Sequence, residues 1–453
     1  MKVELSRSAL SGTIAAPPSK SYLHRLIIAA FLCGKEIKIH TGELSRDALA
    51  TLGAVKSLGG SVFFGNGFVK VCGEGVKTEN KQKVGTNCKG APCEHEAVDC
   101  EESGSTLRFL MPVAAALGKR VSFVGKGRLS SRPINALADC MNTFTQTTKD
   151  RKIIAKLPAG DYEIDGSESS QYITGMLFAL SVLGEGSLTV KGEEVSRGYV
   201  EVTLEVLKKF GVKIERENNV FRIKSGFDVR ETEFFTEGDW SGAAFPLCAA
   251  AICGEVSVTG LSPFSAQGDS VIVKILKDFG AETEFFCEDK QKDNACGKEI
   301  KSDDDFEKGV SGVRVKRANL KGTEVDLTDV PDLAQAIAAV AAFAKGETKL
   351  YFADRLRIKE SDRIAAIINT LAAAGIKAEY SQARGGTITI SGGSPKGTVF
   401  SGGNDHRTVM SAAVIALGSA GDSEIDGAEA AAKSYPEFFN DIIKLGGKVN
   451  VII

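Results

Sequence analysis

Apolar positions along the chain follow two periodicities in turn, and this alternation predicts helices and strands in a repeating order. Stretches rich in alanine and leucine, with helical spacing of their apolar residues, end at a glycine and are followed at once by β-branched residues at strand spacing. We expect each of these glycines to follow its helix in the left-handed conformation that favours glycine. The six glycines are Gly34, Gly118, Gly184, Gly254, Gly346 and Gly418.

A second set of glycine-ended helices lies between these, at Gly59, Gly211, Gly280, Gly375 and Gly446. The corresponding stretch near residue 146, MNTFTQTTKD, lacks a glycine. The pattern indicates six units of roughly 70 residues, each with two helices and several strands. An α-solenoid would also contain paired helices, but strand-forming stretches such as SLTV (187–190) and TITI (387–390) argue against it. The sequence therefore predicts an α/β fold of six repeats in two groups of three.

Composition narrows the classes of partner. The chain has 453 residues, with 56 Lys and Arg against 58 Asp and Glu, and a formal charge of −2. This balance excludes a broad basic surface for nucleic acid or anionic lipid, but it permits local positive pockets. No apolar run reaches the length of about 18 residues that a membrane span needs, and the first residues, MKVELSRSAL, lack the apolar centre of a signal peptide. We expect a cytoplasmic protein, with a polar surface insertion at residues 287–309.

Ten cysteines are spread unevenly along the chain. Several lie in apolar helical patterns, where a free thiol behaves as a small buried apolar group, and this usage fits a reducing compartment. One cluster has to be weighed as a zinc site, because Cys88, Cys93, His95 and Cys100 lie close together. Their spacing, C-x4-C-x-H-x4-C, matches no common zinc pattern. We therefore predict no metal and interpret them as loop and strand cysteines.

The first residues of the six repeated helices are unusually polar and cationic. Helix N-termini have unpaired N–H groups that bind phosphate and carboxylate, although capping alone accounts for Ser19, Ser103 and Asp332. Capping does not account for cations in the first two turns, where a positive side chain opposes the helix dipole. These cations are Lys20, Arg25, Arg108 and Arg407. An anion at the helix ends would remove this penalty, so the pattern favours anion binding.

Further cations gather in three other segments. Arg128 and Arg132 lie in GKGRLSSRPI (125–134), and Lys433 stands in AAAKSYPEFF (430–439). The third segment, DRLRIKESDRI (354–364), surrounds Glu360 and Asp362 with cations; it contains Arg355, Arg357, Lys359 and Arg363. Each segment alone is typical of a solvated, salt-bridged surface. Together they add to the anion-binding interpretation.

The motifs are informative as an ordered set, because each motif alone is too short to identify a family. PPSKSYLHR, ESGSTLRF, GKGRLSSRPI, GSESSQYITG, VSRGY, EGDWS, QGD, VPD, RIKESDR, NDHR and AKSYPEFF follow one another along essentially the whole chain. In this order they closely resemble the 5-enolpyruvylshikimate-3-phosphate (EPSP) synthase family, the 3-phosphoshikimate 1-carboxyvinyltransferases.

The resemblance implies a two-domain inside-out α/β fold of the enolpyruvyl transferase type, with three βαβαββ repeats in each domain. A discontinuous lower domain would comprise 1–19 and 238–453, and an upper domain 20–237. The helix N-termini of both would face the cleft between them, where the active site would lie. The family is usually monomeric, and the resemblance implies no metal or organic cofactor.

The implied reaction moves the enolpyruvyl group of phosphoenolpyruvate to the 5-hydroxyl of shikimate 3-phosphate and releases phosphate, a step of the shikimate pathway to chorismate and aromatic amino acids. Matching motifs place phosphoenolpyruvate against Lys20, Gly104, Arg128, Gln171, Arg363, Arg407 and Lys433. They place shikimate 3-phosphate against Lys20, Ser21, Arg25, Ser169, Ser170, Gln171, Ser196, Asp332 and Lys359, with Tyr199 close by. Asp332 is assigned as the base toward the hydroxyl, and Glu360 as the proton donor at C3, with Lys433 and Lys20 beside them.

Three positions depart from the better-known family pattern. Arg355 stands where an Asn often contacts the shikimate, His24 replaces a common Asn, and Phe109 follows Arg108 where Pro is frequent. None of these changes removes a proposed catalytic group. Because Gly104 leaves room beside the bound phosphoenolpyruvate, we also expect competition by glyphosate.

Three alternatives compete with this interpretation. The sister enolpyruvyl transferase that acts on UDP-N-acetylglucosamine uses a loop cysteine as an acid, and Cys93 and Cys100 lie loosely in range, but the surrounding loop does not match. A non-enzymatic anion-binding repeat protein gives no reason for both carboxylates to accompany the cations. A domain excised from a multifunctional shikimate-pathway polypeptide is the third, and we favour a stand-alone enzyme.

Overall fold

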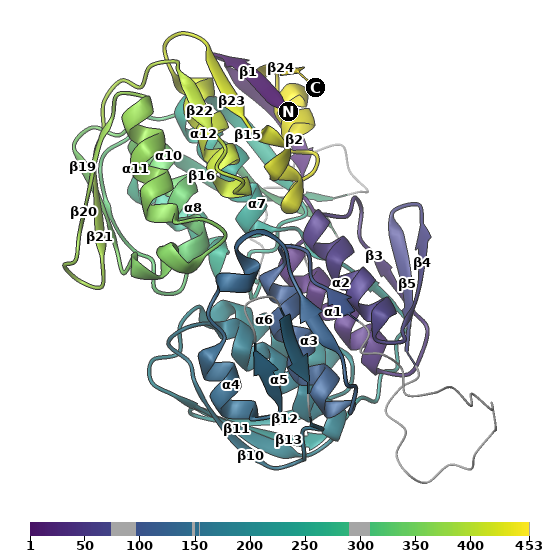
Figure 1. Cartoon of the computed structure of the whole chain (residues 1–453). Coiled ribbons are helices and arrows are strands. Elements are labelled where there is room, and N and C mark those ends of the chain that lie inside the picture. Colours follow the sequence, from purple (N-terminus) through teal and green to yellow (C-terminus); the bar gives the residue numbers. More distant parts are fainter. Residues whose placement is uncertain (74–96, 147–149, 154, 290–308, 453) are drawn as a thin grey trace. The chain divides into compact units, whose positions relative to one another are not determined.

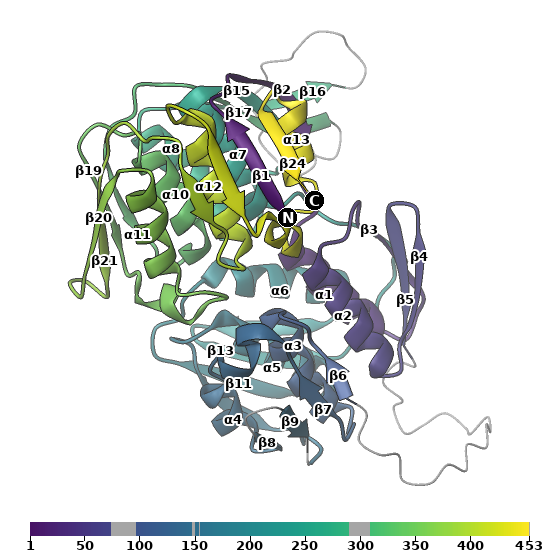
Figure 2. The ribbon, with the colours of Figure 1, turned by 45° about the horizontal axis from the view of Figure 1, so that its top comes forward.

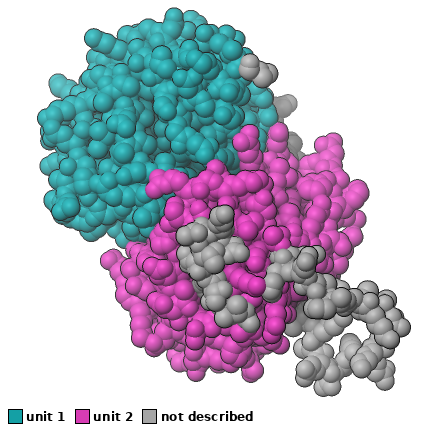
Figure 3. Space-filling model, viewed as in Figure 1, with its two compact units in different colours: residues 1–19, 237–453 teal, residues 20–236 magenta. Residues whose placement is uncertain are grey.

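The computed structural model describes residues 1–73, 97–146, 150–153, 155–289 and 309–452 (Figure 1). The chain forms two compact units, which are coloured separately in Figure 3. Unit 1 comprises Met1–Ser19 and Glu237–Ile453, and unit 2 comprises Lys20–Thr236. Unit 2 is therefore an uninterrupted stretch of sequence inserted into unit 1.

One repeat of unit 2 shows the building block in a single run of chain. Strand β10 (Asp161–Asp165) leads through α5 (Ser170–Leu183) to β11 (Gly186–Lys191), and the two strands pair in parallel. Helix α6 (Arg197–Lys209) and the antiparallel strands β12 and β13 complete the repeat, a βαβαββ unit with the strand order β10-β11-β13-β12. A helical crossover is the connection that parallel neighbours need.

The described strands form six four-stranded sheets of this kind. The sheets of unit 2 are β14 (Glu233–Phe235), β3 (Ile37–His40), β5 (Phe68–Cys72) and β4 (Ser61–Gly65); β6 (Ala97–Asp99), β7 (Ser122–Val124), β9 (Asp150–Ile153) and β8 (Phe144–Gln146); and β10, β11, β13 (Val220–Ser225) and β12 (Lys213–Glu217). Their other helices are α1 (Lys20–Leu32), α2 (Arg46–Ser57), α3 (Gly104–Ala116) and α4 (Asn135–Met141).

The sheets of unit 1 are β2 (Leu10–Ala15), β15 (Gly254–Thr259), β17 (Gly309–Lys316) and β16 (Glu282–Asp289); β18 (Glu324–Asp326), β19 (Glu347–Tyr351), β21 (Thr387–Ser391) and β20 (Lys377–Ser381); and β22 (Val399–Ser401), β23 (Ser423–Asp426), β1 (Lys2–Ser6) and β24 (Lys448–Ile452). Their helices are α7 (Trp240–Cys253), α8 (Ile272–Asp278), α10 (Ala334–Ala341), α11 (Arg363–Ala373), α12 (His406–Gly418) and α13 (Phe438–Lys444). Short 3-10 turns are η1 (Gly127–Ser131), η2 (Gly268–Val271), η3 (Pro331–Leu333), η4 (Asp354–Ile358) and η5 (Ala428–Lys433).

Each unit owes its closure to a strand from a distant part of the sequence. In unit 1, β2 pairs in parallel with β15, so that Leu10 lies opposite Gly254. In unit 2, β14 pairs in parallel with β3, so that Glu233 lies opposite Lys38. The chain therefore completes one repeat of each unit with a strand from near the point where it enters or leaves unit 2.

Helices occupy the middle of unit 1, and sheets lie outside them. Every residue of α7, WSGAAFPLCAAAIC, is buried, as expected for a helix that is apolar all round. Helices α10 and α12 contact α7 and each other, and Figures 1 and 2 show the β18–β21 sheet on the outer side of α10 and α11. This inside-out arrangement, repeated three times in each unit, confirms the predicted fold. In the described part of the chain no helix is long and apolar enough to cross a membrane.

The repeat glycines behave as predicted at most helix ends. Four of the first six and all five of the second set have positive φ, from 70° at Gly118 to 98° at Gly280. The prediction was wrong at two positions. Gly254 is extended, with φ −171°, and a side chain there would meet Leu10 O at 2.1 Å, so it is needed for the close approach of β2. Gly418 is the last residue of α12, where a Cβ would lie 2.5 Å from Ile252 Cγ2.

One further sequence expectation needs correction, and one local signal takes a different form. The repeat that lacks a glycine near residue 146 has its second helix, α4, as the six-unit pattern predicted, and Asn142 follows it with φ 48° in the left-handed conformation. Asparagine tolerates this conformation because its short polar side chain can hydrogen-bond locally. The polar segment 287–309 is not loop throughout, since β16 extends to Asp289 and β17 begins at Gly309. Its middle, 290–308, lies outside the described residues.

Candidate active site

A cluster of charged side chains in unit 1 gathers around Arg363, the first residue of α11. Its guanidinium donates from Nη1 to Asp332 at 2.8 Å, from Nη2 to Glu360 at 2.5 Å and from Nε to Asp405 at 2.9 Å. Only 2% of the side chain is exposed. Burial lowers the pKa of Arg363, but the three carboxylates outweigh it and hold the pKa above its ordinary value. Arg363 is therefore a permanently charged hub.

Further cations lie close to the carboxylate of Asp332. It stands in the η3 turn before α10, and α10 has no side-chain cap, so Asp332 does not serve the capping role that its position suggested. Its carboxylate lies 3.5 Å from Lys359 Nζ and 3.7 Å from Arg407 Nε, in addition to Arg363. Arg407 also donates to the Asp332 carbonyl at 2.8 Å. With 17% of the side chain exposed, the carboxylate is within reach of solvent and of a ligand.

The cations of this cluster differ in their burial and in their hydrogen-bond partners. Burial is the main cause that lowers the pKa of Lys359 to about 8; Asp332 opposes this shift, and Arg355 and Arg363 contribute to it. Arg407 is buried and donates to Ser241 Oγ at 2.7 Å. Lys433, in η5, donates to the carbonyl of Asn404 at 2.7 Å, which places it near the start of α12. An anion bound here would favour the charged form of Lys359.

Two buried aspartates of unit 1 escaped the sequence prediction. Asp405 caps α12 by accepting from Arg407 N at 2.9 Å, and it also accepts from Ser361 Oγ at 2.8 Å. Burial would raise the pKa of Asp405, but Arg363 brings it down to about 2. Asp269, in η2, is raised to a pKa of about 6 by burial and by the charge of Asp332, against Arg407. The NDHR and QGD motifs contain these residues, yet a capping aspartate in sequence carries no sign of its distant partner.

In unit 2, Lys20 and Arg25 stand in the first two turns of α1. Lys20 Nζ pairs with Asp47 at 3.0 Å. Arg25 is buried, and within the described residues it donates to uncharged acceptors only, which are Thr203 Oγ1, Thr174 Oγ1, Ser21 O and Tyr199 O. Burial lowers the pKa of Arg25 to about 9. A buried guanidinium without a carboxylate is suited to an anionic ligand.

The start of α5 contributes neutral donors. Ser169 caps the helix by accepting from Gln171 N at 3.3 Å, and Ser170 is its first residue. The amide of Gln171 accepts from Arg108 Nη1 at 2.7 Å and donates to Ser105 Oγ at 3.0 Å. This network joins α5 to the start of α3, where Gly104 is the first residue. Arg108, one of the cations that the sequence indicated near a helix start, therefore links α3 to the start of α5.

The other predicted residues of unit 2 lie at the starts of helices or turns. Ser196 precedes α6 in the left-handed conformation, with φ 56°, and its side chain makes no capping hydrogen bond to that helix. A β-carbon in this conformation is strained, a feature that often marks functional positions. Arg128 is exposed in η1, and Ser21 is half-buried in α1. The structure therefore divides the predicted residues into an ion-pair cluster in unit 1 and a donor-rich group in unit 2.

Of the four residues in the cysteine cluster, the structure describes Cys100 alone. Cys88, Cys93 and His95 lie outside the described residues. Cys100 is fully buried, and burial raises the pKa of its thiol well above the ordinary range, which leaves it unreactive. Among the residues that the structure describes, no group of three or more His, Cys, Asp and Glu side chains could hold a metal ion.

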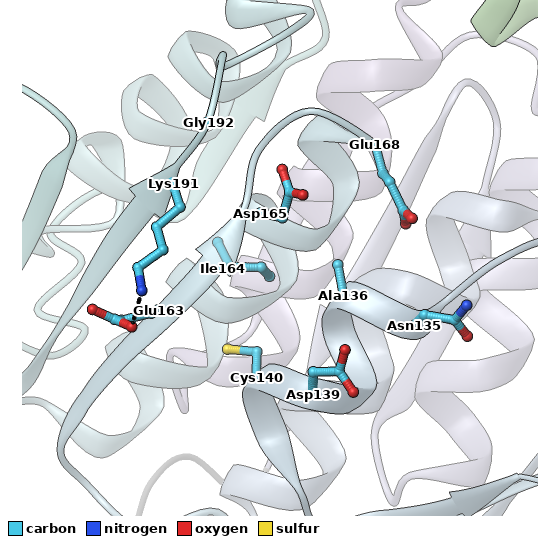
Figure 4. Close-up of a pocket in the computed structure, with 10 residues that line it drawn as sticks. All are labelled: Asn135, Ala136, Asp139, Cys140, Glu163, Ile164, Asp165, Glu168, Lys191 and Gly192. Carbon is cyan, nitrogen blue, oxygen red and sulfur yellow. Dashed lines mark ion pairs between the residues drawn. The ribbon is translucent and has the colours of Figure 1, made fainter.

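A pocket in unit 2 lies beside α4 and β10, and none of its lining residues is among the predicted site residues (Figure 4). Its lining includes the four carboxylates of Asp139, Glu163, Asp165 and Glu168. Lys191 is the cation of the lining, and its ammonium is paired with Glu163 at 2.5 Å. The acidic lining is unsuited to an anionic substrate.

Comparison with known proteins shows which sequences and structures this chain resembles. The sequence profile of EPSP synthase (3-phosphoshikimate 1-carboxyvinyltransferase) matches residues 6–442. A 3-phosphoshikimate 1-carboxyvinyltransferase from Methanothrix thermoacetophila is 36% identical over 459 residues, covering 99% of both chains. One of the same name from Clostridium kluyveri is 34% identical, covering 99% of this chain and 98% of the relative. The structure of an EPSP synthase from Acinetobacter baumannii superposes with a TM-score of 0.75 at 24% identity, covering 99% of this chain and 100% of that chain.

Proposed function

Because the chain belongs to the EPSP synthase family, it is a transferase that moves the enolpyruvyl group of phosphoenolpyruvate to the 5-hydroxyl of shikimate 3-phosphate, and we propose which side chains perform this reaction. The observation that carries the assignment is the cluster around Arg363. It brings two carboxylates, Asp332 and Glu360, onto one guanidinium. Lys359 and Arg407 lie beside the first of them.

The substrates explain why so many cations are required. Each has a phosphate and a carboxylate, so together they bring about five to six negative charges near neutral pH. Phosphoenolpyruvate would bind Lys20, Gly104, Arg128, Gln171, Arg363, Arg407 and Lys433. Shikimate 3-phosphate would bind Lys20, Ser21, Arg25, Ser169, Ser170, Gln171, Ser196, Asp332 and Lys359. These sets draw on both units, so we propose that a lower domain of 1–19 and 238–453 and an upper domain of 20–237 both contribute to one active site.

The chemistry we propose is addition followed by elimination. Asp332 takes the proton of the 5-hydroxyl while the oxygen attacks C2 of phosphoenolpyruvate. Glu360 supplies a proton to C3 with Lys433 nearby, and a tetrahedral intermediate forms. The C–O bond to phosphate then breaks, C3 returns its proton, and the enol ether remains. Lys20 and the arginines stabilise the charge that develops on the departing phosphate.

The geometry gives this assignment a physical basis. Arg363 contacts both carboxylates directly, at 2.8 Å and 2.5 Å, so their separation is set by one rigid planar group. Arg363 is in turn fixed by Asp405, which is completely buried. Catalytic groups held in this way keep their orientation without reorganising during the reaction.

Two experiments test the proposal in order. Purified protein should release phosphate from phosphoenolpyruvate only when shikimate 3-phosphate is also present. Release without the second substrate, or none with both, would contradict the reaction. Asp332→Ala should then lower kcat by about 10²–10⁴-fold, the usual contribution of a general base, with a smaller change in the dissociation constant for shikimate 3-phosphate. Glu379→Ala, which removes an exposed carboxylate, is the control, and near-normal turnover by Asp332→Ala would refute its role.

We propose in addition that the protein acts as a cytoplasmic monomer and that glyphosate competes with phosphoenolpyruvate. Membership of the family supports these statements. Light scattering after gel filtration measures the oligomeric state, and the dependence of glyphosate inhibition on phosphoenolpyruvate concentration measures the competition.

A further inference from the structure

His24 stands at one end of a chain of buried hydrogen bonds that reaches from α1 to the first turn of α3. Its Nδ1 lies 2.6 Å from Thr51 Oγ1 in α2, and this hydroxyl lies 2.6 Å from Thr106 Oγ1 in α3. Thr106 Oγ1 in turn donates to Ser103 Oγ at 2.7 Å. At most 1% of each of these four residues is exposed, so solvent does not compete for the contacts.

The hydrogens of this chain run in one direction. Ser103 Oγ accepts from the Thr106 amide at 3.2 Å and from the Thr106 hydroxyl, so both of its lone pairs are occupied. Because the Thr106 hydrogen is used in this way, the contact of Thr106 with Thr51 needs the hydrogen of Thr51. The other acceptor for that hydrogen, the Asp47 carbonyl, is farther away at 3.4 Å. The contact of Thr51 with His24 then needs a hydrogen on Nδ1.

The surroundings of His24 fit a neutral ring with its hydrogen on Nδ1. Nε2 is buried and has no hydrogen-bond partner among the described residues, so a hydrogen there would make it a buried donor without an acceptor. Burial, together with the charges of Lys20 and Arg25, holds the pKa of His24 well below its ordinary value. The ring therefore stays neutral near pH 7, and its one hydrogen is on the nitrogen that faces Thr51.

The chain ends at the part of α3 that the proposed reaction uses. Ser103 is the cap of α3, and Gly104, which follows it, is a proposed contact of phosphoenolpyruvate. Ser105 Oγ accepts from Gln171 Nε2 at 3.0 Å, and Gln171 is a second proposed contact of that substrate. A hydroxyl whose lone pairs are both occupied holds the cap, and with it this turn, in one position. Groups that are ordered before the substrate arrives spare the cost of ordering them on binding.

We propose that His24 is a positioning residue for phosphoenolpyruvate, because its Nδ1 hydrogen orders the two threonines and, through them, the Ser103 cap. The inference rests on the proposed function and adds to it a residue that acts through others. Asparagine at position 24 would serve equally, since its amide nitrogen, like Nδ1, is bonded to Cγ and donates a hydrogen. The donor is therefore kept although His24 stands where an Asn is common.

The test breaks the chain at its middle link and at its start. Thr51→Val keeps the shape of the side chain without the hydroxyl, so we expect the KM for phosphoenolpyruvate to rise about three- to tenfold, the usual effect of one hydrogen bond. The KM for shikimate 3-phosphate should be unchanged. Thr51→Ser and His24→Asn, which keep the hydrogen-bonding groups, should have the wild-type KM, and His24→Leu should resemble Thr51→Val. If Thr51→Val keeps its KM for phosphoenolpyruvate, or His24→Asn behaves like His24→Leu, the proposal is overturned.

General loosening of unit 2 has a different signature. Phe123→Leu, which truncates a buried ring on β7, should lower the melting temperature, as Thr51→Val does, but leave the KM for phosphoenolpyruvate unchanged. An equal rise in both variants would make the role of the chain merely structural. The double variant of Thr51→Val and His24→Leu should have nearly the KM of Thr51→Val, because members of one chain are not additive. Additive effects would contradict the chain.

Two measurements that need no turnover separate this inference from the proposed function. Nuclear magnetic resonance of isotope-labelled histidine should show His24, identified by its absence from His24→Asn, protonated on Nδ1 and without titration between about pH 5 and 9; a hydrogen on Nε2 would overturn the proposal. If the wild type releases no phosphate with both substrates, the reaction is wrong. The rise in melting temperature caused by phosphoenolpyruvate with shikimate 3-phosphate present should then still be smaller in Thr51→Val, and an equal rise, or none in the wild type, would overturn the inference.

Discussion

Arg363 donates two hydrogen bonds to Asp405, from Nε to Oδ2 at 2.9 Å and from Nη2 to Oδ1 at 3.3 Å, and both side chains are buried. The pair joins the first turn of α11 to the first turn of α12, two helices from different repeats. It leaves Nη1 directed at Asp332. Asp405 is thus a positioning residue: it orients the guanidinium that holds the two proposed catalytic carboxylates.

Asp405→Asn should therefore destabilise unit 1. Loss of one partner leaves the other charge buried and uncompensated, and we expect the free energy of unfolding to fall by about 3 kcal/mol. Urea unfolding followed by tryptophan fluorescence measures this effect in unit 1 specifically, because Trp240 is the single tryptophan of the chain and is buried in α7. Glu379→Gln, which breaks an exposed pair with Lys377, is the control and should cost less than about 1 kcal/mol.

The effect of Asp405→Asn should also depend on pH. Arg363 depresses the pKa of Asp405 to about 2, below its value in an unfolded chain. The stability that this carboxylate contributes is therefore present above about pH 4 and is lost as the pH falls toward 2. The difference in the free energy of unfolding between the variant and the wild type should become smaller over that pH range. A difference that stays constant would contradict the assignment of the stabilising charge to Asp405.

Asp269→Asn should stabilise the protein at pH 8, which is the opposite of the effect expected for Asp405→Asn. Burial and the nearby Asp332 raise the pKa of Asp269 to about 6, so the native state binds a proton that the unfolded state releases between about pH 4 and 6. Stability from this group is present at low pH and is lost as the pH rises through 6. The neutral amide avoids the loss, and we expect the variant to be more stable than wild type at pH 8 by up to about 3 kcal/mol.

Measurement at two pH values makes the Asp269 prediction specific. The same Trp240 fluorescence in urea should give nearly equal stabilities for variant and wild type at about pH 3, where the carboxyl is largely protonated in both the native and the unfolded state. At pH 8 the variant should be the more stable. A variant less stable than wild type at pH 8 would mean that the charged carboxylate is needed, through its interaction with Arg407.

Lys359 should impose a pH dependence on substrate binding. Burial, aided by Arg355 and Arg363, lowers the pKa of Lys359 to about 8. The ammonium form, which would contact shikimate 3-phosphate, is therefore lost in the free enzyme as the pH rises past 8. We expect the KM for shikimate 3-phosphate, measured at saturating phosphoenolpyruvate, to rise about tenfold per pH unit above that point. In Lys359→Arg the side chain stays charged, so the rise should be absent to pH 10; a rise in both proteins would point to another group.

The repeats and their helices could be predicted because each helix end carries its own local signal. A glycine after an apolar helical stretch requires no knowledge of the rest of the fold, and this signal was correct at Gly34 and Gly59. It failed where the requirement was tertiary. Gly254 is needed because β2 passes close by, and Gly418 because Ile252 and Phe343 pack against it, contacts between residues far apart in sequence. At Asn142 a different residue satisfied the same local requirement.

The site was predictable in its residue types but not in its pairing. Motif by motif, the sequence indicated cations at helix starts, and the structure has Lys20, Arg25 and Arg407 in the first turns of α1 and α12. It could not indicate that Arg363 would meet Asp405, 42 residues away, or that the guanidinium of Arg132 would lie against Gly104. Such partners are decided by which helix ends the repeats bring together, and that depends on packing rather than on spacing.

Two departures from the family pattern meet in the structure, and they give the last prediction. The ring of Phe109 lies under the guanidinium of Arg25, with Cζ 5.0 Å from the ring centre, and it meets the ring of His24 edge-on at 6.4 Å. Arg25 has no carboxylate among the partners described above, so the ring face supplies the negative charge density beside this buried cation. Phe109 is therefore a positioning residue for the arginine that would bind shikimate 3-phosphate.

Phe109→Leu removes the ring and keeps an apolar side chain. A buried cation–π contact contributes about 1 kcal/mol or more, so we expect the KM for shikimate 3-phosphate to rise about three- to tenfold while the KM for phosphoenolpyruvate stays the same. Phe123→Leu is the matched control, since Phe123 is equally buried in unit 2 on strand β7. Both variants should lose similar stability, but the control should keep both KM values. If the two variants change the KM values alike, general loosening of unit 2 explains the effect and Phe109 has no special relation to Arg25.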